Sequence, residues 1–280
     1  MNRDSGPRLS SRDWERVGER PSWYLDPLVA QQKRHIHLKL IRDWAADVTS
    51  GCVLKTDLFE EAYGEDRLLP DLFPEGTMRI GMDCAATIVG RAAAKCPSGS
   101  VHWLAGDVRS LPLRTDSLDL IFSNSTLDHL ESAKQFRTAV EELARVLRPG
   151  GRLVITLDNL SNPLYLPLRW ACKLRQMPFR LGYTTSQTGL VDALEQAGLE
   201  VIATGTLIHN PRGISTLLFL TLRRVLGAHA DAPIRGLLEV FARLEHLPTR
   251  RLTACFVSAC ARKPRGAAPT GSHSPKRFSS

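Results

Sequence analysis

Four segments between residues 101 and 158 decide the fold: VHWLAGD at 101–107, LDLIFSN at 118–124, LARVLRPGG at 143–151 and RLVITLD at 152–158. The first, second and fourth are short apolar runs, which predict buried strands. The third segment ends a predicted helix over residues 132–147 at a Pro-Gly-Gly turn. Strands that alternate with helices favour right-handed crossovers, and therefore a parallel, doubly wound sheet.

The same alternation continues on both sides of this stretch. Upstream, we predict a helix from Pro27 to about Val48, a strand from Cys52, a strand over Met78–Asp83 and a helix over residues 85–95. Downstream, the pattern predicts helices over 186–197, 214–226 and 234–246, with strands over 199–208 and 252–261. We therefore expect an α/β fold. It is a doubly wound, mostly parallel, seven-stranded Rossmann-like sheet with helices on both faces and an added helical acceptor or lid region.

Composition divides the chain into three parts. Residues 1–24 are polar and predict a flexible N-terminal segment, and residues 25–263 predict one domain with insertions at 160–185 and 209–250. Residues 264–280 predict a disordered basic tail, because they are rich in Gly, Ala, Pro and Ser. The net charge is +8, and five positive charges lie in the last 19 residues with no acid among them. The basic character thus belongs largely to the tail, which argues against a nucleic-acid partner.

Cysteine usage and the N-terminus bear on the compartment. The six cysteines form no C-x-x-C pair, a pattern typical of reduced, mostly buried thiols. The first residues lack the apolar core of a signal peptide, and no apolar run approaches the roughly 20 residues that span a bilayer. We expect a cytoplasmic protein, with association at a membrane surface as an alternative.

Polar residues close three of the predicted strands. Asp83, Asp107 and Asn124 follow strands whose carboxyl ends meet at one edge of the sheet, where ligands of such folds bind. A carboxylate there accepts two hydrogen bonds at once, which suits a ribose diol or an exocyclic amine.

The order and spacing of these segments resemble the class I S-adenosylmethionine-dependent methyltransferase family. The resemblance covers about residues 50–158 and extends more weakly to 199–208 and 252–261. It implies S-adenosyl-L-methionine as cofactor and a small-molecule acceptor. By this resemblance Asp83 binds the ribose hydroxyls, Asp107 accepts from the adenine amine and Val108 lines the adenine. The cofactor-binding set that it implies also includes Lys55, Asp57, Cys84, Asn124 and Ser125.

The loop after the first strand departs from the family pattern. The family has an acidic residue followed by Gly-x-Gly-x-Gly, whereas this chain has Lys55 at the acidic position. Asp57, Phe59 and Glu61 stand at the glycine positions. In one interpretation the cofactor still binds, with Asp57 or Glu60 pairing with its ammonium and Lys55 with its carboxylate.

Two other interpretations of this loop stay open. In the second, Asp57, Glu60, Glu61 and Asp83 offer hard oxygen ligands to a metal ion, although we assign no metal ligand. In the third, the pocket is closed and the protein is a non-catalytic relative. Asp83 and Asp107 favour the first interpretation, because a dead site has no physical need for either carboxylate.

Candidate catalytic residues follow the fourth strand and precede the helix at 214. His129 can act as a general base near neutral pH, and Asp128 lies beside it. The alternative is that both simply belong to a short helix under the sheet edge. His209, with Arg212 nearby, is a further candidate facing an anionic acceptor.

The segments outside the core are both apolar and basic. Residues 214–226 are strongly apolar and contain Arg223 and Arg224, which suits a lipid-like acceptor or peripheral contact with a membrane. The alternative for this helix is a buried lid over the sheet. We expect a methyltransferase for a small, apolar or lipid-like acceptor. The alternatives are a non-catalytic binding protein of this fold, or a cofactor- or metal-dependent enzyme of this fold with other chemistry.

Overall fold

The computed structural model describes residues 14, 15, 19, 26–64, 67–72, 77–96, 101–174 and 181–265, with the backbone alone for 171–174. Most of the predicted N-terminal segment, the tail beyond residue 265 and part of the 160–185 insertion therefore lie outside the described residues. The five cysteines whose side chains are described are free thiols. Within the described residues, no helix combines the length and apolarity needed to cross a membrane.

The core of the protein is a seven-stranded sheet in the order β3-β2-β1-β4-β5-β7-β6. Its strands are β1 Cys52–Thr56, β2 Met78–Asp83, β3 Val101–Ala105, β4 Leu118–Asn124, β5 Leu147–Asp158, β6 Glu200–Leu207 and β7 Phe256–Arg262. The first five strands run parallel, and β7 lies antiparallel between β5 and β6. The predicted mostly parallel, seven-stranded sheet is confirmed. The winding reverses between β1 and β4, which makes their carboxyl ends the switch point of the sheet.

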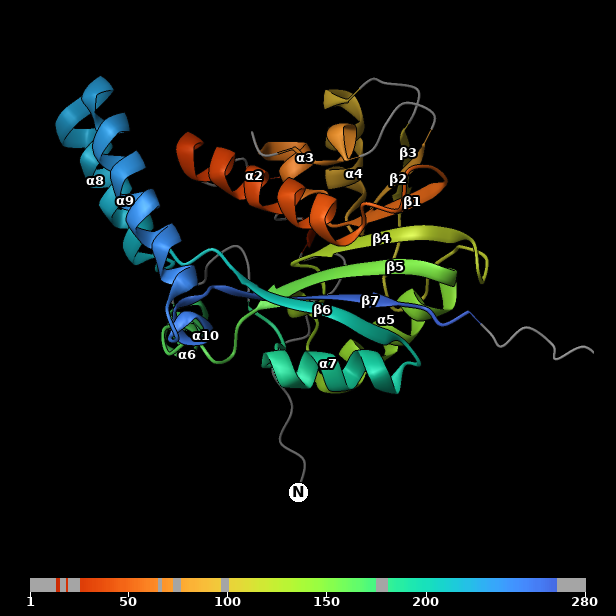
Figure 1. Cartoon of the computed structure of the whole chain (residues 1–280). Helices are drawn as coiled ribbons and strands as arrows, with labels where there is room; N and C mark the ends of the chain where they lie inside the picture. Colours follow the sequence, from red (N-terminus) through yellow and green to blue (C-terminus); the bar gives the residue numbers. More distant parts are fainter. Residues whose placement is uncertain are drawn as a thin grey trace, which may run out of the picture.

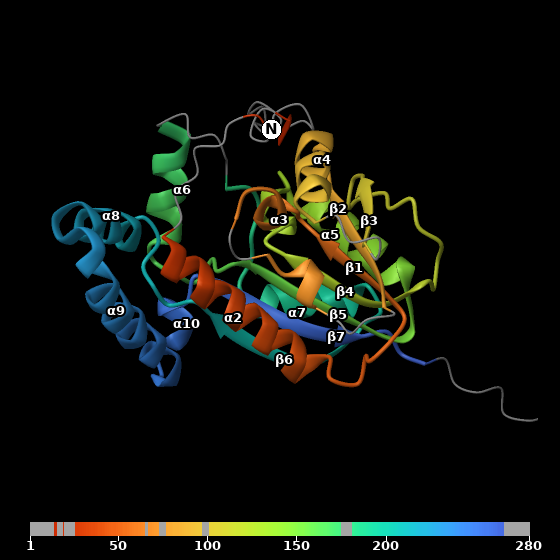
Figure 2. The same ribbon diagram turned by 90° about the horizontal axis from the view of Figure 1, so that it is seen from above.

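Helices cover both faces of this sheet (Figure 1). One face carries α2 (Pro27–Trp44), α3 (Phe59–Tyr63) and α4 (Ala86–Lys95), and the other carries α5 (Ala133–Val146) and α7 (Gln187–Gln196). At the edge near β6, α8 (Ile214–Leu226) and α9 (Asp231–Arg243) project from the sheet as a helical pair (Figures 1 and 2). Near their base lie α6 (Tyr165–Leu174) and α10 (Arg250–Thr253). Four 3-10 turns join these elements: η1 Leu69–Asp71, η2 Leu127–His129, η3 Gly227–Ala230 and η4 Leu244–His246.

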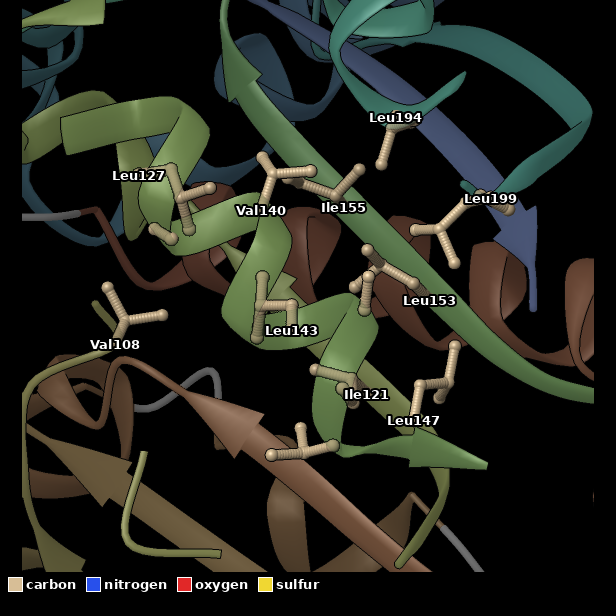
Figure 3. Packing of buried hydrophobic residues seen from close by; sticks show 14 of the residues in the cluster. Val108, Ile121, Leu127, Val140, Leu143, Leu147, Leu153, Ile155, Leu194 and Leu199 are labelled. Atoms are coloured by element: carbon tan, nitrogen blue, oxygen red, sulfur yellow. The ribbon is translucent and has the colours of Figure 1, made fainter. Parts of the chain in front are cut away.

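Packing of α5 on the sheet shows why these residues form these elements (Figure 3). Phe136, Val140 and Leu143 recur at helical spacing and are buried against Ile121 and Ile155 of the sheet. Burying each such side chain stabilises the fold by roughly 1.5–3 kcal/mol. Leu120 and Phe122 of β4 pack with residues of α2 and α4 on the opposite side, so the strand is buried throughout.

Some boundaries differ from the prediction. β5 begins at Leu147, before the predicted strand segment 152–158, because Gly150 adopts a positive φ of 86° and its N–H donates to the Lys263 carbonyl 2.8 Å away. The final strand begins at Phe256, since the Ala254 N–H closes a helical turn on Arg250. Two further helices, α3 and α6, form where the sequence predicted none.

Candidate functional site

Backbone strain marks the carboxyl edge of the sheet. Asp57 directly follows β1 with a φ of 66°, and Ser125 directly follows β4 with a φ of 46°. Left-handed backbone is uncommon outside glycine, and such residues gather at functional sites. Asp57 stands where the family has its first glycine, and Asp is among the few residues that tolerate this conformation. The loop therefore keeps a backbone of the glycine type without the glycine.

The side chains at the three glycine positions are bound within the loop and its neighbours. Asp57 accepts a hydrogen bond from the Phe59 N–H at 2.8 Å, and the Phe59 ring lies 4.9 Å from that of Tyr63. Glu61 is buried and accepts from the Leu68 and Leu69 N–H groups at 3.2 and 3.1 Å. Each of the three side chains thus has a local structural partner.

Lys55 lies fully buried beneath this loop. Its ammonium donates to Glu61 at 2.9 Å and to the Asp57 carbonyl. Burial alone would lower the pKa of Lys55, but the carboxylates of Glu61, Glu60 and Asp57 raise it above its ordinary value. A charged Lys55–Glu61 pair therefore stabilises the loop that follows β1.

Glu60 lies at the switch point itself and is 7% exposed. One carboxylate oxygen accepts from Lys33 of α2 at 2.5 Å and from the Asn124 amide at 3.4 Å. The other oxygen lies 3.8 Å from the Lys55 ammonium and has no hydrogen-bond partner among the described residues. Burial would raise the pKa of Glu60, but Lys33 and Lys55 lower it to about 2. The group stays ionised, and Asn124 is oriented toward it because its own oxygen accepts from Thr156 at 2.8 Å.

Asp83 ends β2 and ties the loop to the start of α4. Its two oxygens accept from the Leu58 and Ala85 N–H groups at 3.0 and 2.9 Å. Burial nevertheless raises the pKa of Asp83. The pKa of the next residue, Cys84, is also raised, by burial and by the carboxylates of Asp83 and Asp57, so its thiol stays protonated.

Asp107 lies two residues beyond β3 and is partly exposed. Its carboxylate forms an ion pair with the Arg109 guanidinium, with a shortest N–O distance of 2.6 Å. Partial burial opposes ionisation, but this pairing lowers the pKa of Asp107. Val108 between them is buried and packs in the core beside α5. An adenine amine at Asp107 would share the carboxylate with Arg109.

The candidate catalytic residues occupy two places. Asp128 and His129 lie in η2, so both belong to a short helix, and the His129 ring packs edge-on against Trp14 at 4.7 Å. His209 lies beyond β6, where its Nδ1 is 2.8 Å from the Thr253 hydroxyl and burial lowers its pKa. Asp128 is buried, and one of its oxygens has no hydrogen-bond partner among the described residues.

An ion pair connects these two places. Asp128 accepts from the Asp158 N–H at 3.0 Å, and Asp158 pairs with Arg212 at 2.6 Å. The Arg212 guanidinium also lies over the Phe256 ring, 4.2 Å from its centroid. Burial raises the pKa of Asp158 to about 6, although Arg212 opposes the shift.

Sequence reasoning missed Lys33 and Asp158. Asp158 ends the predicted strand segment 152–158, a signal of the same kind as for Asp83, but the sequence analysis gave it no role. Lys33 gave no signal, because its role depends on where α2 crosses the sheet (Figure 2). No group of three or more His, Cys, Asp or Glu side chains in the described part of the chain is arranged to hold a metal ion.

Residues 61–155 match the family model described as a methyltransferase domain. Together with the sheet order, this match confirms the predicted resemblance to the class I S-adenosylmethionine-dependent methyltransferases over this part of the chain. The match begins at residue 61, after β1 and Asp57, and ends within β5, so it rests on the segment that contains β2 to β5.

Curated proteins include distant relatives of this chain. It is 31% identical to a malonyl-[acyl-carrier protein] O-methyltransferase of Chlorobium luteolum over 139 residues, which are 48% of this chain and 47% of that protein. The chain spans about half or less of the length of the curated relatives that it matches.

Two solved structures share its fold. One is phosphoethanolamine N-methyltransferase 2 of Haemonchus contortus in complex with S-adenosyl-L-methionine, with a TM-score of 0.61, 14% identity, and coverage of 92% of this chain and 61% of that one. The other is the [4+2]-cyclase SpnF, with a TM-score of 0.57, 18% identity, and coverage of 91% of this chain and 93% of that one.

Proposed function

We propose that this protein transfers a methyl group from S-adenosyl-L-methionine to a small, apolar or lipid-like acceptor. The observation that carries the proposal is the carboxyl edge around the switch point. It holds a buried carboxylate at the end of β2 and a buried carboxylate oxygen of Glu60 without a hydrogen-bond partner among the described residues. A ribose diol and an ammonium group suit these two acceptors, so the residues present fit the cofactor.

Each strand end has a part in holding the cofactor. Asp83, with Cys84 beside it, receives the ribose, and Asp107 and Val108 receive the adenine. Asn124 and Ser125 border the methyl-bearing end, and Asp57 with Lys55 supports that end from beneath the loop. The bound cofactor supplies a methyl group already activated on a sulfonium, so alignment accounts for much of the rate.

A proton must leave only if the acceptor carries one on the reacting atom. Asp128 is the best placed of the proposed bases, because it is buried next to Asp158 and keeps one oxygen without a hydrogen-bond partner in the described structure. His129 follows it in η2, and His209 lies beyond β6, three residues before Arg212 of the Asp158–Arg212 pair. We propose that these groups accept and pass on that proton.

The acceptor class rests on the surface of α6 and α8. In α8 only Ser215 and Phe219 are buried, so it is not the buried lid helix that its apolar sequence allowed. Large apolar side chains of the two helices are exposed instead: Leu166 at 58%, Trp170 at 67%, Ile214 at 58%, Leu217 at 68% and Val225 at 72%. The two helices meet where Leu168 approaches Gly213, so Ile214 lies at this junction and Val225 lies at the other end of α8.

Charge on the same segment favours an anionic membrane. Residues 209–252 contain seven arginines and three acidic residues. An apolar helix surface flanked by cations suits the interface of an anionic bilayer. We propose a cytoplasmic enzyme that contacts a membrane peripherally through this surface and takes its acceptor there.

A binding protein without catalysis, or an enzyme with other chemistry, is the second candidate. The charged residues at the glycine positions favour it, and a [4+2]-cyclase shares the fold. Methyl transfer separates the candidates. We expect the full chain, with methyl-labelled S-adenosylmethionine and a membrane lipid extract, to label an extractable lipid. Asp83→Ala should abolish the label, and Asp43→Asn, an exposed acid on α2, should not change it. Cofactor binding without label in any lipid or soluble small-molecule fraction would support the second candidate.

A further inference from the structure

We propose that Glu60 and Lys33 form a charge-reading subsite for the amino-acid end of the cofactor, in which Glu60 binds its ammonium and Lys33 its carboxylate. This inference rests on the proposed function and concerns the same site. In the family pattern, the backbone of the glycine-rich loop contacts this end of the cofactor. Here two side chains make the contact, and one of them, Lys33 of α2, lies outside the loop.

Location is the first argument. Glu60 is in α3 directly after β1, and Asn124, which donates to it, is the last residue of β4. Glu60 therefore spans the crevice between the two strands at which the winding of the sheet reverses. In doubly wound folds the ligand enters this crevice.

The state of Glu60 is the second argument. The Glu60 side chain is 9% exposed, and one carboxylate oxygen has no hydrogen-bond partner among the described residues. An ionised carboxylate with an unsatisfied buried oxygen costs free energy unless a donor reaches it. The Lys55 ammonium is 3.8 Å away and donates to Glu61, so it does not hydrogen-bond to this oxygen. An alkylammonium, with three N–H donors and a positive charge, matches this oxygen in chemistry.

The balance of charge is the third argument. Among the described residues linked by these contacts, the carboxyl groups of Asp57, Glu60, Glu61 and Asp83 outnumber the ammonium groups of Lys33 and Lys55. In agreement, burial and the charge of Glu60 raise the pKa of Asp57 well above its ordinary value. A ligand with a positive group balances this region.

Lys33, and not Lys55, is the partner for the ligand carboxylate. Lys55 is fully buried and held by Glu61 and the Asp57 carbonyl. The Lys33 side chain keeps 21% of its surface exposed and reaches Glu60 from α2 on a flexible stem. It can turn from Glu60 to a ligand carboxylate a few ångströms away while Glu60 takes up the ligand ammonium. The two exchanges keep every charge paired.

Two ligands that differ only at the amino-acid end test the inference. S-adenosylhomocysteine carries the ammonium and the carboxylate, whereas 5′-methylthioadenosine keeps the adenosine and the thioether without them. Calorimetry on the full chain should show that Glu60→Gln and Lys33→Met each weaken S-adenosylhomocysteine binding by about 10-fold or more, since hydrogen bonds to charged groups are worth about that much. Both variants should leave the affinity for 5′-methylthioadenosine within about two-fold.

The controls separate this inference from the function on which it rests. Lys39→Met removes an exposed lysine from the same helix and should change neither affinity. If Glu60→Gln does not fold, Lys33→Met still tests the subsite. Lys33 is partly exposed, so its replacement should leave the fold intact. Equal weakening of both ligands, or unchanged binding of S-adenosylhomocysteine, would overturn the subsite while the proposed function stands. Failure of the unaltered protein to bind either ligand would overturn both.

Discussion

Replacing Lys55 by methionine tests whether the buried Lys55–Glu61 ion pair stabilises the atypical loop after β1. Lys55 and Glu61 have fully buried side chains, 2.9 Å apart, and Glu61 also holds two N–H groups of the segment that leads into η1. Removing one partner leaves an uncompensated buried charge, which costs about 3–5 kcal/mol of unfolding free energy. In a chain of this size each kcal/mol shifts the midpoint of thermal unfolding by roughly 2–4 °C, so we expect a fall of roughly 6–20 °C.

The double variant Lys55→Met/Glu61→Gln makes this reasoning refutable. Glutamine keeps an oxygen for the Leu68 and Leu69 N–H groups but carries no charge, so the double variant should be more stable than Lys55→Met alone by at least about 1 kcal/mol. Urea unfolding followed by circular dichroism measures all variants, with Lys39→Met as the exposed control. A Lys55→Met protein as stable as the unaltered chain, or additive effects of the two substitutions, would show that the pair does not fasten the loop.

Three further predictions follow from the described contacts. Asp158 has a pKa of about 6 in the fold against an ordinary value of 3.8, so the folded state binds its proton more tightly. Its contribution to stability is complete below about pH 4 and is lost as the pH rises through about 6. The stability advantage of the unaltered protein over Asp158→Asn should therefore shrink over that interval in urea titrations, and a constant advantage would contradict the assignment. Ser132→Ala removes the cap of α5, whose hydroxyl accepts from Gln135 at 3.3 Å, and should cost about 1 kcal/mol; no measurable loss would mean that solvent caps the helix equally well. Leu217→Ser/Val225→Ser should weaken co-sedimentation with anionic phosphatidylglycerol vesicles by at least about 10-fold without lowering the unfolding midpoint, because both side chains are exposed, and undiminished binding would remove α8 from the membrane surface.

The sheet could be read from the sequence because its signals are local. Each strand is a short apolar run, and the helix that carries Phe136, Val140 and Leu143 shows its buried face by spacing alone. The strand-end residues Asp83 and Asn124 follow from the same pattern, because parallel strands end at a common edge. The boundaries of β5 and β7 did not follow, since a turn at Gly150 and a short helix before Phe256 depend on pairing between distant strands.

The methionine end of the site depends on contacts that no local pattern encodes. Lys55 could be seen to stand in place of an acid, but the position of its partner Glu61 depends on the formation of α3. Lys33 is one of several lysines and arginines on α2, and only the packing of that helix on the sheet brings it to Glu60. Charge at the glycine positions looked like an obstacle in the sequence. In the fold these side chains turn to local partners, and a glycine-type backbone conformation remains at Asp57.

Calorimetric titration of the full chain with S-adenosylhomocysteine tests the central claim most directly, that this carboxyl edge binds the cofactor despite its atypical loop. We predict saturable binding of one ligand per chain at concentrations well below millimolar, weakened at least about 10-fold by Asp107→Ala, which removes the acceptor proposed for the adenine amine. Absence of binding at millimolar S-adenosylhomocysteine would contradict the claim, and an unchanged affinity in Asp107→Ala would contradict the placement of the adenine.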